Sequence, residues 1–378
     1  MGARGTRVKS RMTQPRTFIF AGGGTGGHLF PGVAVALELK RREPNARLLF
    51  VGSERELEQT ILARHGLEHR SLPVESLREL TRHPWRFATR NWTAWRAARR
   101  MMHEERPSVV VGLGGYASAP LVWQATRARC PVVLLEQNVV PGRATRWLAR
   151  SASLVCTSFA ETRDRLSRGA KVEVTGNPVR REIAEFASSL AVASTAPREL
   201  LVLGGSQGAD SLNEAVVAAL HLVGDVRSGW RVIHQTGPRQ VETIRRAYAE
   251  LSLDAVVEPF FDDMLARYRA ASLVVSRAGA TTLAELACCG VPMILLPYPH
   301  AADDHQRANA RIYKAHGAAV CVEHLTSTEQ TAARLADPLR SLLTDESRRR
   351  AMSLSARGIA RLDATSAVVD RVLELARS

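Results

Sequence analysis

A chain of 378 residues, 45% of them hydrophobic, is long enough to bury two cores. Lys and Arg outnumber Asp and Glu by 52 to 37, and this net charge of +15 favours an acidic partner such as nucleic acid, an anionic membrane surface or a phosphorylated substrate. No apolar stretch reaches the roughly 18 residues of a membrane span. The five cysteines form no C-x-x-C pair with a histidine partner, so neither a disulfide framework nor a zinc site is predicted.

The N-terminal segment is basic, with no acid among its side chains Arg4, Arg7, Lys9, Arg11 and Arg16. It shows no hydrophobic periodicity and no apolar block of the kind found in secretion signals. We predict that residues 1–16 form a disordered basic tail and that the protein remains in the cytoplasm.

A hydrophobic run at residues 17–20 leads into a glycine-rich loop at residues 21–28 and then into a helical pattern. Five glycines within residues 22–27 allow a sharp turn and a close approach to a ligand, and the free N–H groups that open the next helix favour an anion. The loop therefore predicts a phosphate-bearing ligand. Its G-x-G-x-x-G spacing also admits a dinucleotide cofactor.

Short β-rich runs then alternate with helical stretches, at residues 48–51, 109–111, 132–135 and 154–156. Each run is continuously apolar, which is typical of strands buried on both faces of a parallel sheet with helices between them. Residues 174–178 close this half, and the small, polar residues 191–197 predict an exposed loop.

The pattern restarts with a hydrophobic run at 200–203, a second glycine loop at 204–209 and a helix at 211–222. Further buried runs follow at residues 231–234, 255–257, 273–275, 293–296 and 319–322. We therefore predict an α/β protein with two Rossmann-like, doubly wound domains that face a cleft, where ligands bind beyond the strand ends. The first domain comprises residues 17–178 and the C-terminal helix 362–378, and the second comprises residues 179–361.

A nicotinamide or flavin enzyme needs an acidic residue about 20 positions beyond its glycine loop to hold the ribose hydroxyls. The nearest acid here, Glu54, comes 27 residues after Gly27. Glycine loops also open both halves, whereas a dehydrogenase usually reserves one half for its substrate. Both observations disfavour an oxidoreductase.

His28 directly follows the first glycine loop, so its ring is expected to project into the cleft. Histidine is the side chain best suited to accept a proton near neutral pH, which makes His28 a candidate general base. The alternative is a histidine that only bonds a loop carbonyl.

Residues 276–285 follow a buried strand, and Thr281 or Thr282 can cap the helix that carries Glu285. A carboxylate early on a helix gains about 0.3–1 kcal/mol from the helix dipole, which alone would explain Glu285. The functional alternative is a bidentate contact with two neighbouring sugar hydroxyls.

Asp303, Asp304 and His305 suggest a metal site, but consecutive side chains rarely converge on one ion. The D-x-D motif typical of metal-dependent sugar transferases occurs nowhere in the chain. We expect chemistry without a metal, in which helix dipoles and an arginine take up the charge of the leaving group.

An aromatic and basic stretch covers residues 82–96. At helical spacing, Trp85, Ala88, Trp92 and Trp95 share one face, while Arg82, Arg86 and Arg90 share a neighbouring one. This pattern fits either an ordinary helix that covers a sheet or a patch that lies on anionic lipid. Nucleic acid is disfavoured, because no known binding module accompanies the charge.

Eight motifs occur in the order found in the MurG family: GGTGGH (23–28), GGY (114–116), EQN (136–138), GNPVR (176–180), GGSQGA (204–209), FDDM (261–264), SRAGATTLAE (276–285) and DHQ (304–306). From residue 17 onward, the chain closely resembles this family. The resemblance implies a GT-B fold and metal-independent, inverting transfer of GlcNAc from UDP-GlcNAc to the C4 hydroxyl of lipid I, which gives lipid II for peptidoglycan synthesis. No cofactor is implied.

The resemblance also implies roles for individual residues. His28 is the candidate base, Tyr116 faces the acceptor, and Glu285 holds the ribose hydroxyls. The implied UDP-GlcNAc site comprises Thr25, Gly26, Gly27, Asn138, Arg180, Ser206, Phe261, Ala280, Thr281, Thr282, Leu283, Ala284, Glu285 and Gln306. Within it, the resemblance places Phe261 by the uracil, Ser206 at the diphosphate and Gln306 at the GlcNAc hydroxyls. Trp85, Arg86, Trp92 and Trp95 become the expected membrane patch.

The partners implied are UDP-GlcNAc, the undecaprenyl-linked lipid I acceptor and the anionic cytoplasmic face of the bacterial inner membrane, where the enzyme would sit peripherally beside other cell-wall synthesis proteins. Three alternatives stay open: a GT-B transferase for another acceptor, a UDP-sugar epimerase, and a non-catalytic nucleotide-sugar binding module. An epimerase would release UDP without any acceptor, and a binding module would form no product.

Overall fold

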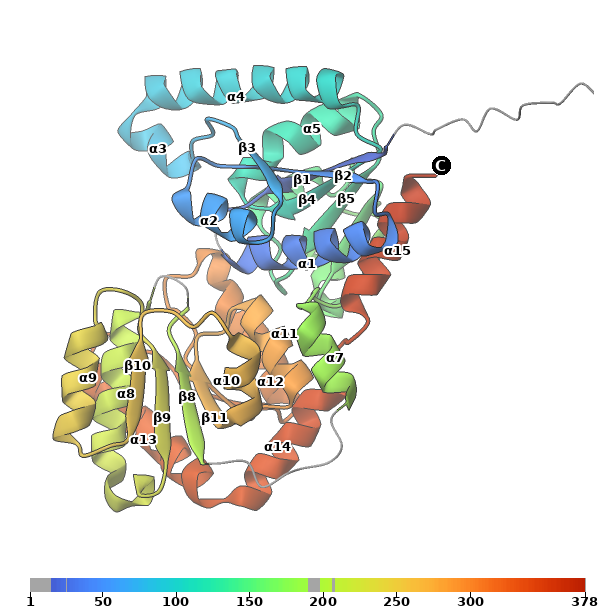
Figure 1. Cartoon of the computed structure of the whole chain (residues 1–378). Helices are drawn as coiled ribbons and strands as arrows, with labels where there is room; N and C mark the ends of the chain where they lie inside the picture. The colour runs from blue at the N-terminus through green and yellow to red at the C-terminus, as the bar shows by residue number, and fades with distance from the viewer. Residues whose placement is uncertain (1–14, 25, 190–197, 206–207, 378) are drawn as a thin grey trace, which may run out of the picture.

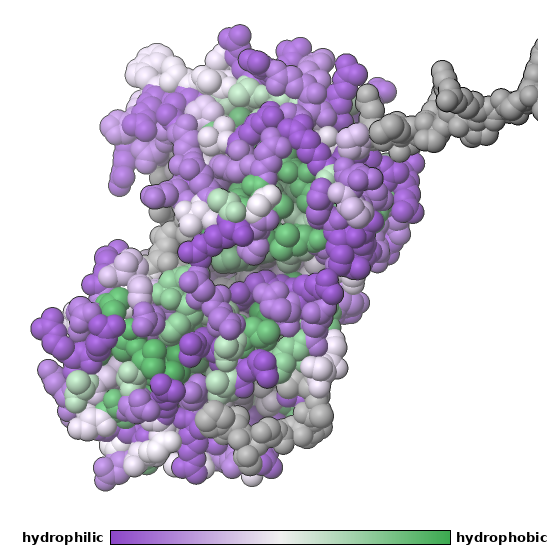
Figure 2. All heavy atoms as spheres, viewed as in Figure 1, coloured by the Kyte–Doolittle hydropathy of each residue, from purple (hydrophilic) through white to green (hydrophobic). Residues whose placement is uncertain are grey.

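The computed structural model describes residues 15–24, 26–189, 198–205 and 208–377. Two α/β halves lie one above the other (Figure 1), as the sequence predicts. Most of the predicted N-terminal tail and the predicted loop at residues 191–197 lie outside the described residues. Figure 2 shows that the surface on this face is mostly hydrophilic, with smaller hydrophobic areas over both halves.

The first half is built on a seven-stranded parallel sheet with the strand order β3-β2-β1-β4-β5-β6-β7. The strands are β1 (Thr17–Gly22), β2 (Arg47–Gly52), β3 (Glu68–Ser71), β4 (Val109–Gly114), β5 (Val132–Glu136), β6 (Leu154–Thr157) and β7 (Val172–Val174). The sequence patterns miss β3, because its residues are polar and it lies at the edge of the sheet.

Successive side chains of β1 pack into different layers, because strand side chains alternate between faces. Phe18 and Phe20 pack with α1 (Gly26–Arg42), α2 (Glu56–Arg64) and α15 (Ala364–Leu375). Ile19 and Ala21 pack with α4 (Pro84–Glu105) and α5 (Ala119–Arg127) on the opposite face. Both faces of the sheet are therefore covered, as the continuous apolar runs predict.

The second half repeats this design in a six-stranded parallel sheet, with the order β10-β9-β8-β11-β12-β13. The strands are β8 (Glu199–Leu203), β9 (Arg231–Gln235), β10 (Ala255–Glu258), β11 (Ala271–Ser276), β12 (Met293–Leu295) and β13 (Ala319–Cys321). The helices α8 (Asp210–Val223), α9 (Val241–Glu250) and α13 (Thr328–Thr344) pack in one layer. The opposite layer contains α7 (Arg181–Ser189), α10 (Met264–Ala270), α11 (Ala280–Cys289), α12 (His305–Ala315) and α14 (Glu346–Ile359).

The last helix returns to the first half. After α14, α15 runs beside α1 (Figure 1), and its buried residues Val368, Val369 and Val372 join the core around β1. At the start of α15, the Thr365 hydroxyl donates to the carbonyl of Val179 at 2.9 Å. The chain thus crosses between the halves twice, once before α7 and once before α15.

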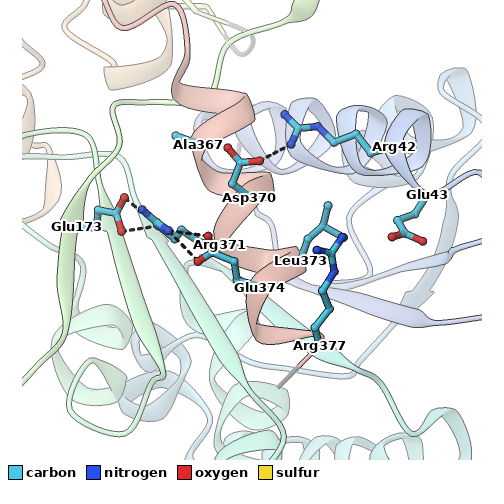
Figure 3. Close-up of a pocket in the computed structure, with 9 residues that line it drawn as sticks. All are labelled: Arg42, Glu43, Glu173, Ala367, Asp370, Arg371, Leu373, Glu374 and Arg377. Atoms are coloured by element: carbon cyan, nitrogen blue, oxygen red, sulfur yellow. Dashed lines mark hydrogen bonds and ion pairs between the residues drawn. The ribbon is translucent and has the colours of Figure 1, made fainter.

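A pocket of about 470 Å³ lies between α15, α1 and β7 (Figure 3). Five of its charged side chains pair with one another: Arg371 bonds Glu173 at 2.8 Å and Glu374 at 2.7 Å, and Arg42 bonds Asp370 at 2.5 Å. Exposed ion pairs of this kind contribute little stability. The apolar face of α15 therefore accounts for most of its attachment.

The aromatic and basic stretch is divided between two helices. The helix α3 (Leu77–Arg82) ends before α4 begins at Pro84, so Arg82 does not share a helix with Arg86 and Arg90 as predicted. Proline is well tolerated at the first helical position, which explains why the new helix starts there. None of the helices in the described ranges is both long and apolar enough to cross a membrane.

Candidate active site

The two sheets bring their glycine loops to equivalent positions. In each half the strand order reverses beside the first strand, between β1 and β4 and between β8 and β11. Ligands of doubly wound sheets bind at this reversal, beyond the carboxyl ends of the strands. The loops at residues 22–27 and 204–209 follow β1 and β8, so both sites predicted from glycine content lie at such points.

The first glycine loop lies against the start of α11 in the other half. The hydroxyl of Thr281, in the first turn of α11, donates to the carbonyl of Gly27 at 3.0 Å. Nearby, the Asn309 amide nitrogen donates to Asn138 Oδ1 at 3.0 Å, and Asn309 Oδ1 accepts from the Val139 N–H at 3.0 Å. A ligand bound by α11 would therefore lie close to the first glycine loop.

A buried carboxylate supports the first glycine loop. Glu58, which is 2% exposed, accepts hydrogen bonds from the N–H of Gly24 at 2.5 Å and from the N–H and hydroxyl of Ser53 at 3.0 and 2.5 Å. Gly23 has φ 157°, and a Cβ there would lie 2.6 Å from Glu58 Oε2. Only glycine lets the loop close onto this carboxylate.

His28 lies in the first turn of α1 and is half-buried. Its Nδ1 is 3.0 Å from Oε1 of Gln137, a buried residue that follows β5. A Cβ on Gly114, at the end of β4, would come within 3.1 Å of His28 Nδ1, so this glycine makes room for the ring. His28 thus bonds the side chain of Gln137 and not a loop carbonyl, and its ring lies beside Gly114 at the strand reversal.

Two other predicted residues of the first half lie near this reversal. Tyr116 begins the 3-10 turn Tyr116–Ser118 directly after β4 and is half-buried. Asn138 is half-buried, and its N–H donates to Glu136 Oε1 at 3.1 Å. Asn309, its partner across the junction, has no counterpart in the sequence prediction, because only the packing of the two halves brings these amides together.

Glu285 is in the second turn of α11, is 5% exposed and accepts three hydrogen bonds from protein groups. Arg180 Nε and Nη2 donate to its two oxygens at 2.9 and 3.0 Å, and the Tyr268 hydroxyl donates to Oε2 at 3.0 Å. Burial alone would lower the pKa of Arg180, but the charge and hydrogen bonds of Glu285 outweigh burial and raise that pKa above its usual value.

Two predictions for residues 276–285 are wrong: neither Thr281 nor Thr282 caps the helix, and the helix dipole does not explain Glu285. The N-cap of α11 is Gly279, no side chain caps the helix, and Thr281 points to Gly27 instead. Glu285 is the sixth residue of α11, beyond the first turn in which the helix dipole acts on a carboxylate.

The start of α11 presents backbone donors. The N–H groups of Ala280, Thr281 and Thr282 come before the first intrahelical bond, which the Leu283 N–H makes to Gly279. These groups, with Ala284 behind them, form an N-terminus suited to a phosphate. Gln306 faces the same region, where its Oε1 accepts from the N–H groups of Ala278 at 3.2 Å and Tyr298 at 2.9 Å.

Phe261, predicted beside the uracil, is 5% exposed. Its N–H donates to Gln235 Oε1 at 3.1 Å, and the Arg267 guanidinium lies 5.0 Å from its ring centroid. Thr25, Gln207 and Ser206, the last predicted to hold the diphosphate, are outside the described residues.

A buried cation was not singled out from the sequence. Arg277 follows β11, is 8% exposed, and donates to the Leu296 carbonyl and the Ser211 hydroxyl, both at 3.0 Å. Its Nε makes no hydrogen bond within the described ranges. Burial lowers the pKa of Arg277 to about 10. Ser211 lies in the first turn of α8, so this positive charge is beside the second glycine loop.

The predicted membrane patch is divided by the packing. Trp85 and Trp92 are 84% and 69% exposed, and Arg86 is exposed while bonding Glu75 at 3.1 Å. Trp95 instead packs edge-on against Trp123 and Trp147, at ring distances of 6.3 and 6.5 Å. Trp147 is itself 52% exposed, so the aromatic surface extends beyond α4. The described residues contain no group of three or more His, Cys, Asp or Glu side chains placed to hold a metal.

Two doubly wound parallel sheets, each with a glycine-rich loop at its strand reversal, form the GT-B fold. The chain belongs to glycosyltransferase family 28: the family's N-terminal domain matches residues 18–157 and its C-terminal domain matches residues 199–367. The resemblance inferred from the eight motifs is thereby confirmed.

Curated relatives match over almost the whole chain. The UDP-N-acetylglucosamine–N-acetylmuramyl-(pentapeptide) pyrophosphoryl-undecaprenol N-acetylglucosamine transferase of Geobacter sulfurreducens is 39% identical over 368 residues, which cover 95% of this chain and 98% of the relative. The enzyme of the same name from Desulfotalea psychrophila is 39% identical over 363 residues, 94% of this chain and 96% of the relative.

Solved structures agree on the fold. The crystal structure of Acinetobacter baumannii MurG is similar with a TM-score of 0.73 and 29% identity, over 95% of this chain and all of that one. A UDP-GlcNAc 2-epimerase from Neisseria meningitidis, bound to UDP-GlcNAc, reaches a TM-score of 0.67 at 14% identity, over 95% of this chain and 100% of that chain. The epimerase shares the fold alone, so fold does not separate the two activities.

Proposed function

We propose that the protein transfers GlcNAc from UDP-GlcNAc to the C4 hydroxyl of the MurNAc unit of lipid I, with inversion, to form lipid II in peptidoglycan synthesis. The relatives that carry this activity in their names match the chain from end to end. The observation that carries the proposal is the position of His28, which lies at the strand reversal of the first half. His28 directly follows Gly27, whose carbonyl accepts from the Thr281 hydroxyl at the start of α11 in the other half.

The reaction is a direct displacement. The acceptor hydroxyl attacks the anomeric carbon of GlcNAc, while His28 accepts its proton and the bond to UDP breaks with its electron pair on the diphosphate. Negative charge develops on the leaving group, and preorganised donors stabilise it. The N-termini of α8 and α11 and the buried cation Arg277 supply such donors in the second half.

The donor residues take the roles that the resemblance implies. The uracil lies by Phe261, the diphosphate by Ser206 and residues 280–284, and GlcNAc between Gln306 and the junction formed by Gly26, Gly27 and Asn138. Tyr116 faces the acceptor.

Glu285 receives the ribose hydroxyls. A carboxylate has about four lone-pair sites, and Arg180 and Tyr268 already occupy three of them. Ribose binding therefore shifts Arg180 away from Glu285 and frees its guanidinium for the diphosphate.

Replacing the proposed base tests this function. His28→Ala should lower turnover of labelled UDP-GlcNAc with lipid I by about 10² to 10⁴, the usual worth of a positioned general base, with UDP binding unchanged. The matched control is His103→Ala, which removes an exposed histidine of α4. Near-normal turnover in His28→Ala would reject the base assignment, and conversion of UDP-GlcNAc into an epimeric UDP-sugar without lipid I in the parent protein would indicate an epimerase.

We further propose that the protein acts at the anionic cytoplasmic face of the inner membrane, in contact with cell-wall synthesis proteins. Support comes from the exposed Trp85 and Trp92, the adjacent Arg86 and the net charge of +15. Replacing these three residues together by alanine should reduce flotation with phosphatidylglycerol vesicles severalfold. Leu354→Ala, which removes an exposed leucine of the second half, is the control. Unchanged flotation would mean that α4 merely covers the sheet.

A further inference from the structure

The hydrogen-bond pattern around His28 determines which ring nitrogen carries a proton. Gln137 Nε2 donates to the Leu113 carbonyl at 3.4 Å, and a carbonyl can only accept, so the amide nitrogen faces Leu113. The amide oxygen therefore faces His28 Nδ1, at 3.0 Å. Because that oxygen also only accepts, Nδ1 must be the protonated nitrogen and Nε2 keeps a free lone pair.

The surroundings hold the ring in this orientation. Gln137 is 2% exposed. Gly114, at the end of β4, lies on the Nδ1 side of the ring, where a Cβ would come within 3.1 Å of Nδ1. Within the described ranges, the hydrogen bond of the His28 ring is made through Nδ1 and not through Nε2. The free nitrogen is thus the one available to a substrate hydroxyl.

The charged groups of the neighbouring elements are engaged elsewhere. Glu58 bonds Gly24 and Ser53, and the Arg55 guanidinium bonds the Gly24 carbonyl. Glu136, which ends β5 directly before Gln137, accepts from the N–H groups of Asn138 and Gly142. The partner of His28 Nδ1 is therefore a neutral amide, where many histidine bases have a carboxylate.

We propose that Gln137 is the positioning residue that fixes the tautomer of His28, with the proton on Nδ1 and Nε2 as the proton acceptor. The proposal rests on the proposed function, since it assigns His28 the role of base. An adjacent carboxylate would favour the imidazolium form, whereas the amide orients the ring without adding charge.

Two variants at one position separate charge from orientation. Gln137→Glu should move the acidic limb of the kcat/KM profile to higher pH by roughly one unit, because a neighbouring carboxylate stabilises the imidazolium. Gln137→Met, similar in size but without an acceptor, should lower kcat about tenfold with KM for UDP-GlcNAc unchanged. Gln59→Glu adds the same charge at an exposed site of the first half and should leave the profile in place. The proposal is wrong if kcat/KM of Gln137→Glu and of the parent protein falls at the same acidic pH.

The tautomer can also be read without an activity assay. In protein labelled with ¹⁵N-histidine, long-range ¹H–¹⁵N spectra distinguish protonated from unprotonated ring nitrogens, and His28→Ala assigns the signals. We expect a protonated Nδ1 in the parent at neutral pH, and an Nε2–H signal would overturn the proposal. Normal turnover in His28→Ala together with a protonated Nδ1 would reject the proposed base and leave the tautomer assignment intact.

Discussion

Replacement of Glu58 by glutamine should disturb the first glycine loop, although the two side chains have nearly the same shape. One carboxylate oxygen accepts from both the Gly24 N–H and the Ser53 hydroxyl, and the other accepts from the Ser53 N–H. A glutamine amide has only one accepting oxygen. Whichever way it is turned, its NH₂ group faces the N–H of either Gly24 or Ser53.

The cost of Glu58→Gln follows from these contacts. One buried N–H loses its acceptor, which costs about 1–3 kcal/mol, and the remaining bonds lose their charge assistance. We expect a loss of about 2–4 kcal/mol in the local stability of the loop. Because His28 follows this loop, a displacement of even 1 Å could lower turnover by about 10².

The assay is steady-state transfer of labelled GlcNAc to lipid I, with UDP affinity measured separately by calorimetry. Turnover should fall at least about tenfold, with UDP affinity unchanged, since the proposed UDP site is in the other half. Glu56→Gln, an exposed change on the same helix, serves as the control. Parental turnover together with a parental urea midpoint in Glu58→Gln would refute the reasoning.

Two further predictions concern the second half. Arg277→Met should weaken UDP binding about tenfold or more in calorimetry, because a charged hydrogen bond is worth about 1.5–3 kcal/mol. The control is Arg334→Met, which removes an exposed ion pair. Equal UDP affinities of Arg277→Met and the parent protein would contradict the role of Arg277. Burial lowers the pKa of His234 to about 3. Between pH 6.5 and 3, the unfolded chain therefore binds a proton that the folded protein does not, so the free energy of unfolding falls as the pH falls. Unfolding in urea should show about 2 kcal/mol less stability at pH 5 from this group. His234→Gln should remove that part of the pH dependence, and an unchanged dependence would contradict it.

The strands were predictable because burial on both faces imposes continuous apolar runs such as those of β4 and β8. The edge strands β3 and β7 were not, since the sequences EHRS and VEV carry no such signal. The helix in the second half was predicted at residues 211–222 and is observed at Asp210–Val223. Local periodicity therefore specifies the layers, and it fails where an edge strand is held by backbone pairing alone.

The site was only partly predictable, because several of its contacts join residues far apart in sequence. Glu58 lies 34 residues from Gly24, and Gln137 lies 109 residues from His28. One signal was available for Gln137: it follows a buried strand of a parallel sheet, and such positions face the ligand edge. Helical spacing placed Trp95 with Trp85, whereas the indoles of Trp123 and Trp147 hold it elsewhere.

The double crossing between the halves has a mechanical consequence. The two crossings touch: a Cβ on Gly176, before α7, would lie 2.6 Å from the Cβ of Arg361, before α15, and Thr365 bonds Val179 beside them. The chain itself therefore ties the two halves together at this one place, whereas the contacts of Gly27 with Thr281 and of Asn138 with Asn309 are hydrogen bonds that can break and re-form. The two connections keep the halves joined when those bonds break.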